Sequence, residues 1–205
     1  KVEIHDLFQN SYDELDGSIK SRVLNFIMKL QQDADATGLD FKRPKGAASK
    51  HVRTARVTDN YRAVLVNAGA DDDSGRLYLV AVKKHDDAYK FAETLTLQVN
   101  EKTGAAELYD PIALDEAMDN ARSEVAGAAP LMPSSVSHAD LERFGVASEV
   151  AAELKQITTE EALLKLVEAL PSSQGNAVLD LAFGKDPQDV WNDLVVDEPG
   201  PIDVT

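Results

Sequence analysis

Residues 51–68 read HVRTARVTDNYRAVLVNA, and this stretch decides the fold of the first half of the chain. Its two ends, residues 51–57 and 61–68, are rich in the β-branched and aromatic residues that favour strands. Thr58, Asp59 and Asn60 lie between them and are typical of a turn, so the stretch predicts a β-hairpin with a three-residue loop. The apolar run at 76–83 predicts a third antiparallel strand.

Helical patterns flank these strands. After a short extended segment at 2–8, a helical turn is expected over 11–16, and a longer helix then begins at Ser18. Its apolar residues recur at the spacing of one buried helix face and end near Gly38. A further short helix is expected over 85–93. This order predicts an α+β domain over residues 1–98, with an antiparallel sheet and helices on one face.

The distribution of charge separates the two halves of the 205-residue chain. Residues 1–98 contain 15 basic and 15 acidic residues, whereas residues 99–205 contain 6 and 21, so the second half carries the whole net charge of −15. Such asymmetry indicates two modules, and the acidic one should repel nucleic acid. We expect a hairpin, helix and linker over 99–136, a small helical domain over 137–196, and a linker tail over 197–205, as if more protein followed.

Several function classes are excluded by composition and motif. The chain has no cysteine, which rules out disulfides, thiol catalysis and cysteine-ligated metal sites. It contains no ATP-binding loop, no dinucleotide fingerprint and no nucleophile elbow. His85, Asp86 and Asp87 do not form a metal site, because the side chains of adjacent residues cannot all converge on one ion. We therefore expect neither a cofactor nor a metal in this chain. No membrane segment and no signal peptide are seen, which favours the cytoplasm.

A basic cluster covers residues 42–62, whose net charge is +6 because Asp59 is the only acid among seven cations. The cations are Lys42, Arg43, Lys45, Lys50, Arg53, Arg56 and Arg62. This density favours a phosphate-binding surface for nucleic acid. The alternative is a solvated sheet face with surface ion pairs. Because side chains alternate along a strand, Arg53 and Arg56 should face opposite sides unless a bulge intervenes.

His85 and Tyr89 form a second candidate site, where the third strand of the meander turns into a helix. Histidine shuttles protons near neutral pH, and tyrosine can orient a phosphate or stack on a base. The alternative is a helix start capped by Asp86, with Tyr89 partly in the core.

Two of these segments resemble the RelE/ParE toxin superfamily. Residues 52–64 are similar to its second and third strands, with a basic strand, a turn and Tyr-Arg. Residues 77–82, followed by the segment from His85 to Tyr89, are similar to its last strand and its C-terminal segment. In the RNase branch the resemblance implies arginines that hold the transition-state phosphate and a His or Tyr that assists. The matching residues are Arg53, Arg56, Arg62, His85 and Tyr89. The chain lacks a Glu found in some members, and the ParE branch is not a nuclease.

A longer resemblance concerns the N-terminal region of UvrD/Rep-like superfamily I helicases. It rests on segments 85–89, 99–105, 140–146 and 157–171. In those bacterial DNA-repair helicases a toxin-like domain and an acidic helical region precede the ATPase core. The resemblance implies that ATP and Mg²⁺ belong to a helicase core outside this chain, which would be its partner in cis.

Three functions therefore remain open. The first is an accessory module that binds nucleic acid through 42–62, with acidic residues 99–205 covering that basic face by intramolecular contact. The second is an mRNA endonuclease that uses Arg62, His85 and Tyr89. The third is a domain that binds only protein. No membrane partner is expected.

Overall fold

The chain forms two compact units that divide between Thr96 and Leu97. The computed structural model describes residues 2–32, 39–67, 77–123 and 129–194. Several sequence expectations lie wholly or partly outside these ranges: the helix end near Gly38, part of the segment expected to hold a linker within 99–136, and the tail at 197–205. Each unit is described here by itself.

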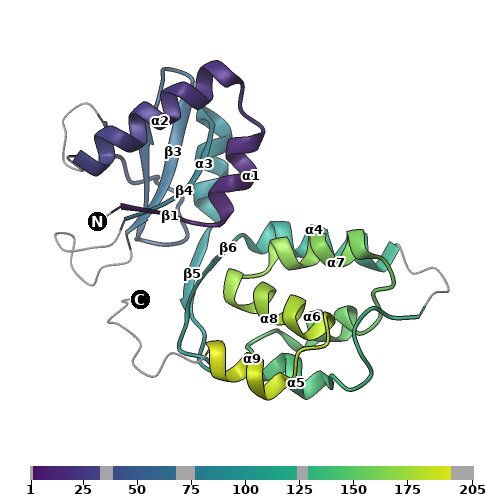
Figure 1. The fold of residues 1–205 in the computed structure, drawn as a ribbon. Helices are drawn as coiled ribbons and strands as arrows, with labels where there is room; N and C mark the ends of the chain where they lie inside the picture. The colour runs from purple at the N-terminus through teal and green to yellow at the C-terminus, as the bar shows by residue number, and fades with distance from the viewer. Residues whose placement is uncertain (1, 33–38, 68–76, 124–128, 195–205) are drawn as a thin grey trace. The chain divides into compact units, whose positions relative to one another are not determined.

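A four-stranded sheet forms the centre of the first unit, with the strand order β1-β4-β3-β2 (Figure 1). Its strands are β1 (Val2–Ile4), β2 (Val52–Arg56), β3 (Tyr61–Asn67) and β4 (Leu77–Lys84). The antiparallel meander β2-β3-β4 is present as expected. In contrast to a purely antiparallel sheet, β1 pairs with β4 in parallel. The two helices after β1 return the chain so that β2 starts in the direction of β1, and two antiparallel turns then give β4 that same direction.

Helices α1 (Leu7–Asp13) and α2 (Gly17–Gln32) cover one face of this sheet (Figure 1). The apolar stripe of α2, with Val23, Phe26 and Leu30, packs on Ala63 and Leu65 of β3 in one core. The α+β class is confirmed.

The second face of the sheet is also covered, which differs from the expectation of helices on one face. Val64 and Val66 alternate with the core residues of β3 and are fully buried. Helix α3 (His85–Thr94) contacts β2, β3 and β4, and its buried Ala88 and Ala92 lie outside the core of α1 and α2. The small alanines allow α3 to approach the sheet closely.

The second unit combines a hairpin with helices around its own core (Figure 1). The elements are β5 (Thr96–Val99), β6 (Ala106–Tyr109), α4 (Pro111–Ser123), α5 (His138–Arg143), α6 (Ser148–Leu154), α7 (Glu160–Ala169), α8 (Ser172–Ala182) and α9 (Pro187–Leu194). Helix α7 begins after Thr159, whose side chain accepts a hydrogen bond from the Ala162 amide.

The segment expected to be a linker is instead part of this core where the structure describes it. Met132 and Val136 are buried among side chains of the helices, and the Leu131 amide donates to the Ile157 carbonyl. Helix α4 shares the same core. The expected separation of 99–136 from 137–196 is therefore not seen, because apolar residues at 131–136 gain more by burial than by extension into water.

A buried carboxylate ties the hairpin to the helices of the second unit. Glu107 is 2% exposed, and its two oxygens accept hydrogen bonds from Gln98, Asn100, Ser173 and Gln174 at 2.7–3.2 Å. The Asn100 amide also donates to the Phe144 carbonyl at 2.8 Å. Each Glu107 oxygen thus has two neutral donors, which is how proteins accommodate a charge away from water.

No helix among the described residues is both long enough and apolar enough to cross a membrane.

Candidate nucleic-acid interface

Three cations form a row across the meander on the face that α3 covers in part. The register pairs Arg56 of β2 with Arg62 of β3, and Arg62 with Lys83 of β4. Directly paired residues in a sheet point to the same face with their Cβ atoms about 5 Å apart. Like charges so placed repel one another and destabilise a sheet. Arg56, Arg62 and Lys83 are called the cationic row below.

Asp40 provides the counter-charge at one end of the cationic row. Its Oδ2 lies 3.3 Å from Lys42 Nζ, 3.5 Å from Arg56 Nη2 and 3.7 Å from Arg62 Nη1. The segment that carries Asp40 runs along the edge of β2, where the Arg56 amide donates to the Leu39 carbonyl and Lys42 forms a bridge with Thr54. One carboxylate therefore serves three cations, which leaves a net positive charge.

Arg62 is the most unusual member of the row. Its side chain is only 8% exposed, yet Nε and Nη1 donate no hydrogen bond. A buried donor without an acceptor carries the cost of its lost hydration, and the cost is larger for a charged group. Such a guanidinium is suited to bind an anion with several oxygens, as arginine does with phosphate.

The other predicted cations lie away from this row. Arg53 faces the opposite side of β2, as the alternation predicts, and its Nη1 donates to the backbone carbonyls of Lys50 and Val52. Arg43, Lys45 and Lys50 are exposed in the segment that leads into β2. The predicted site therefore divides, and only Lys42, Arg56 and Arg62 converge.

Sequence reasoning missed two residues of this interface. Lys83 was part of an apolar strand pattern, and its Nζ lies 5.3 Å from the centre of the Phe91 ring of α3. Asp40 stands two residues before the basic cluster and was not associated with it. Its positive φ of 48° is rare outside glycine, and no sequence pattern predicts this backbone conformation at Asp40.

His85 and Tyr89 meet at the first turn of α3. Their ring centres lie 5.0 Å apart, and His85 Nδ1 lies 2.9 Å from Asp86 Oδ1. The His85 amide donates to the carbonyl of Asn60 in the turn before β3, which places it at the same end of the sheet as Arg62. Among the described residues, no hydrogen bond or ion pair joins either ring to Arg62.

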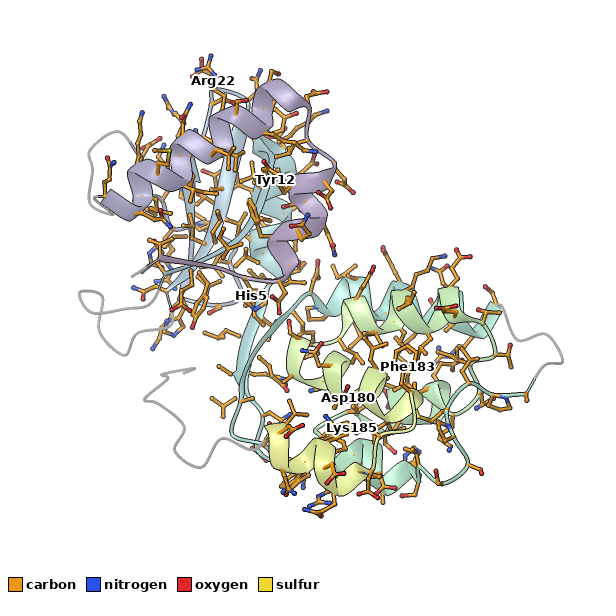
Figure 2. The ribbon with its side chains drawn as sticks, viewed as in Figure 1. His5, Tyr12, Arg22, Asp180, Phe183 and Lys185 are labelled. Atoms are coloured by element: carbon orange, nitrogen blue, oxygen red, sulfur yellow. The ribbon has the colours of Figure 1, made fainter. Side chains whose placement is uncertain are left out.

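Several cations of the second unit are engaged within that unit, Lys185 and Arg143 among them. Lys185 forms ion pairs with Asp180 at 2.9 Å and with Asp193 at 2.7 Å, and Figure 2 shows Lys185 and Asp180 together near the end of α8. Both carboxylates raise the pKa of Lys185 above its usual value. Arg143 lies over the Trp191 ring, 4.1 Å from its centre. These contacts and the acidic charge make the second unit a poor site for phosphate.

No group of three or more His, Asp or Glu residues that could hold a metal ion occurs in the part of the chain that the structure describes.

Comparisons with known proteins add little to this geometry. No family model matches the sequence, and no curated protein matches it. Among solved structures, the YoeB/ParE toxin from Agrobacterium tumefaciens aligns with a TM-score of 0.33 and 16% identity, over 42% of this chain and 98% of the toxin. A likeness at this level establishes neither a family nor a function. The resemblance to helicases finds no support in these comparisons.

Proposed function

We propose that the first unit binds the phosphate backbone of nucleic acid through the cationic row and Lys42. The observation that carries this proposal is Arg62, a buried guanidinium with unused donors at the middle of three aligned cations. Repulsion within the row and the bare donors both oppose folding, and a bound phosphate relieves both.

The exposure of the cations around Arg62 favours the sugar-phosphate backbone of a nucleic acid as the ligand, rather than a single small anion. Arg56 and Lys42 are about half exposed, so they can reach a strand that passes over the sheet edge. Contacts of this kind position a nucleic acid without reading its sequence. Binding should therefore depend strongly on salt and weakly on base composition.

Fluorescence anisotropy of the full chain with labelled single-stranded DNA, duplex DNA and RNA tests this proposal. Arg56→Gln should weaken binding about fivefold and reduce the steepness of the salt dependence by about 0.7 for a single strand, because one phosphate contact is lost. The matched control is Arg53→Gln, three residues away on the same strand but on the opposite face. Equal losses in the two variants, or no binding by the unaltered chain, would contradict the proposal.

We also propose, on the resemblance of the quoted segments alone, that this binding module belongs to a superfamily I DNA helicase as its accessory region. The chain would then place nucleic acid for an ATP-dependent core in cis. Co-purification of the chain with a separately produced core from the same coding sequence tests this placement. If the chain is not encoded with such a core, the helicase part of the proposal fails while the binding part remains.

A second candidate function is cleavage of mRNA. The contact between His85 and Tyr89, at the same sheet end as Arg62, favours it. One of the two side chains would remove the proton of a ribose 2′-OH, whose oxygen attacks the adjacent phosphorus. The bond to the 5′-oxygen of the next nucleotide then breaks, the other side chain protonates that leaving oxygen, and Arg62 offsets the charge that develops on the phosphate. Growth arrest on expression of the chain, relieved by His85→Ala and by Tyr89→Phe, would support it. RNA that stays intact on a denaturing gel would exclude it.

A further inference from the structure

The position of Asp40 implies control over the cationic row, an inference that rests on the proposed function. All three ion pairs of Asp40 use the same oxygen, Oδ2. Their cations come from three places: Lys42 is two residues further along the chain, Arg56 is on β2 and Arg62 is on β3. That oxygen is buried and takes part in no hydrogen bond. The carboxylate thus sits among the cations at ion-pair distance without satisfying any of their donors.

Rigid attachment on both sides keeps Asp40 at this point. Leu39 is buried in the core of the first unit, and its carbonyl accepts from the Arg56 amide. On the other side, Lys42 and Thr54 exchange both backbone hydrogen bonds. Because the main chain is fixed before and after Asp40, its carboxylate can leave the cations only by turning about its side-chain bonds, which is fast and local.

A phosphate group meets the needs of these cations better than the Asp40 carboxylate does. It offers oxygens in several directions, whereas the carboxylate presents one oxygen to Lys42, Arg56 and Arg62. The donors Nε and Nη1 of Arg62, which are bare in this structure, would gain acceptors. The two anions cannot share the site without repulsion.

We propose that Asp40 is a built-in competitor for phosphate: its carboxylate occupies the place among Lys42, Arg56 and Arg62 that a backbone phosphate takes in the complex. Binding then requires the carboxylate to turn away. Asp40 thereby keeps the affinity for nucleic acid lower than the cations alone would allow. In the absence of nucleic acid, its negative charge reduces the repulsion among the three cations.

The test compares Asp40→Asn with the unaltered full chain in binding a labelled single-stranded DNA. Asparagine keeps the shape and tolerates the positive φ, but it removes the charge. We expect affinity about five- to tenfold higher and a salt dependence steeper by about 0.7, because one more cation is free to displace counterions. The matched control is Glu14→Gln, an exposed carboxylate at the end of α1 on the other side of the sheet, which should change affinity less than twofold.

A second variant guards against a folding defect. Asp40→Gly suits the positive φ and also removes the carboxylate, so it should bind as tightly as Asp40→Asn. In both variants, inorganic phosphate should raise the thermal midpoint more than it does in the unaltered chain, relative to chloride at equal ionic strength.

The outcomes separate this inference from the function on which it rests. If the Asp40 variants bind no tighter than the unaltered chain, while Arg56→Gln still weakens binding, the competitor role is wrong and the proposed function stands. If neither the unaltered chain nor any variant binds nucleic acid or phosphate, both the proposed function and the competitor role of Asp40 are wrong.

Discussion

Glu107 of the second unit and Arg62 of the first are both buried charged residues, but their hydrogen-bonding capacity is filled to very different degrees. Both oxygens of Glu107 accept two hydrogen bonds each, from side chains that lie up to 67 residues away in the chain. Two of the buried nitrogens of Arg62 donate none. A filled network holds a fold together, whereas an unfilled one is a cost that a ligand can remove.

The groups that surround Glu107 and Arg62 also differ in charge. Glu107 is surrounded by neutral donors, so its charge meets no competing ion within hydrogen-bond distance. Arg62 lies beside two other cations of its row and shares one carboxylate with Arg56 and Lys42. The first arrangement specifies one packing of a hairpin on a helix, and the second leaves room for exchange of an anion.

The largest expected effect is the loss of Glu107. Glu107→Ala leaves four donors without their acceptor and should destabilise the second unit by about 3–5 kcal/mol. Urea unfolding followed by the fluorescence of Trp191, the only tryptophan of the chain, reports on that unit. Glu101→Ala, an exposed carboxylate in the turn of the same hairpin, is the control and should cost less than about 0.5 kcal/mol. Similar effects in both would mean that the network does not hold the hairpin.

A slightly smaller effect is expected from filling the space beside Asn100. Gly145 has a φ of 87°, and a Cβ added there would lie 2.1 Å from Asn100 Nδ2, the donor that links Glu107 to the Phe144 carbonyl. Gly145→Ala should cost about 2–4 kcal/mol, from backbone strain and displacement of Asn100.

Gly184 supplies the comparison for that substitution. Its φ of 86° is nearly the same, but a Cβ there meets nothing within 4 Å. Gly184→Ala should therefore cost only the backbone strain, about 1 kcal/mol. Trp191 fluorescence in urea measures both variants, and equal costs would show that Asn100 moves aside freely.

Arg62 should contribute far less to stability than Glu107 does. Arg62→Met keeps much of the buried side-chain volume, removes the bare donors and leaves Asp40 with Lys42 and Arg56. We expect a change within about 1 kcal/mol in either direction, together with loss of nucleic-acid binding. Thermal unfolding beside the anisotropy assay checks this. A loss of stability as large as that of Glu107→Ala would show that Arg62 holds the fold together. The two buried charges would then not differ in their roles.

The smallest effect concerns the ionisation of Tyr109. Burial, and then the charge of Glu107, raise the pKa of Tyr109 above its usual 10.0. A raised pKa favours the protonated phenol in the folded state, so this contribution to stability is present below pH 10 and is lost as pH rises through the folded-state pKa.

Ultraviolet titration of the phenolate checks this prediction. Glu107→Gln should lower the pKa of Tyr109 toward its usual value by removing the nearby charge, whereas Glu101→Gln should leave it unchanged. An unaltered titration in Glu107→Gln would show that burial alone raises the pKa of Tyr109.

Much of the local structure could be read from sequence. The strands of the meander and the helices after Ser18 and at 85–93 all lie within a few residues of their expected places. The separation of Arg53 from Arg56 onto opposite faces also followed from the period of a strand. These features depend on neighbours along the chain, which the sequence displays directly.

Contacts between distant segments could not be read in the same way. The linker expected within 99–136 has the composition of a loop, yet Met132 and Val136 are buried because helices from elsewhere in the unit cover them. The placement of the expected helix at 85–93 on the second face of the sheet could not be read either, because alternation shows that Val64 and Val66 need cover but not which element supplies it.

By itself, the sequence determined the α+β pattern of the first unit, the acidic character of the second, and the gathering of cations in 42–62. Only the tertiary structure decided which of those cations act together, because strand register brings Lys83 beside Arg62 and an edge segment brings Asp40 to both arginines. It also decided that Glu107 is satisfied and Arg62 is not. Charge is a property of each residue, whereas its cost or use depends on what surrounds it after folding.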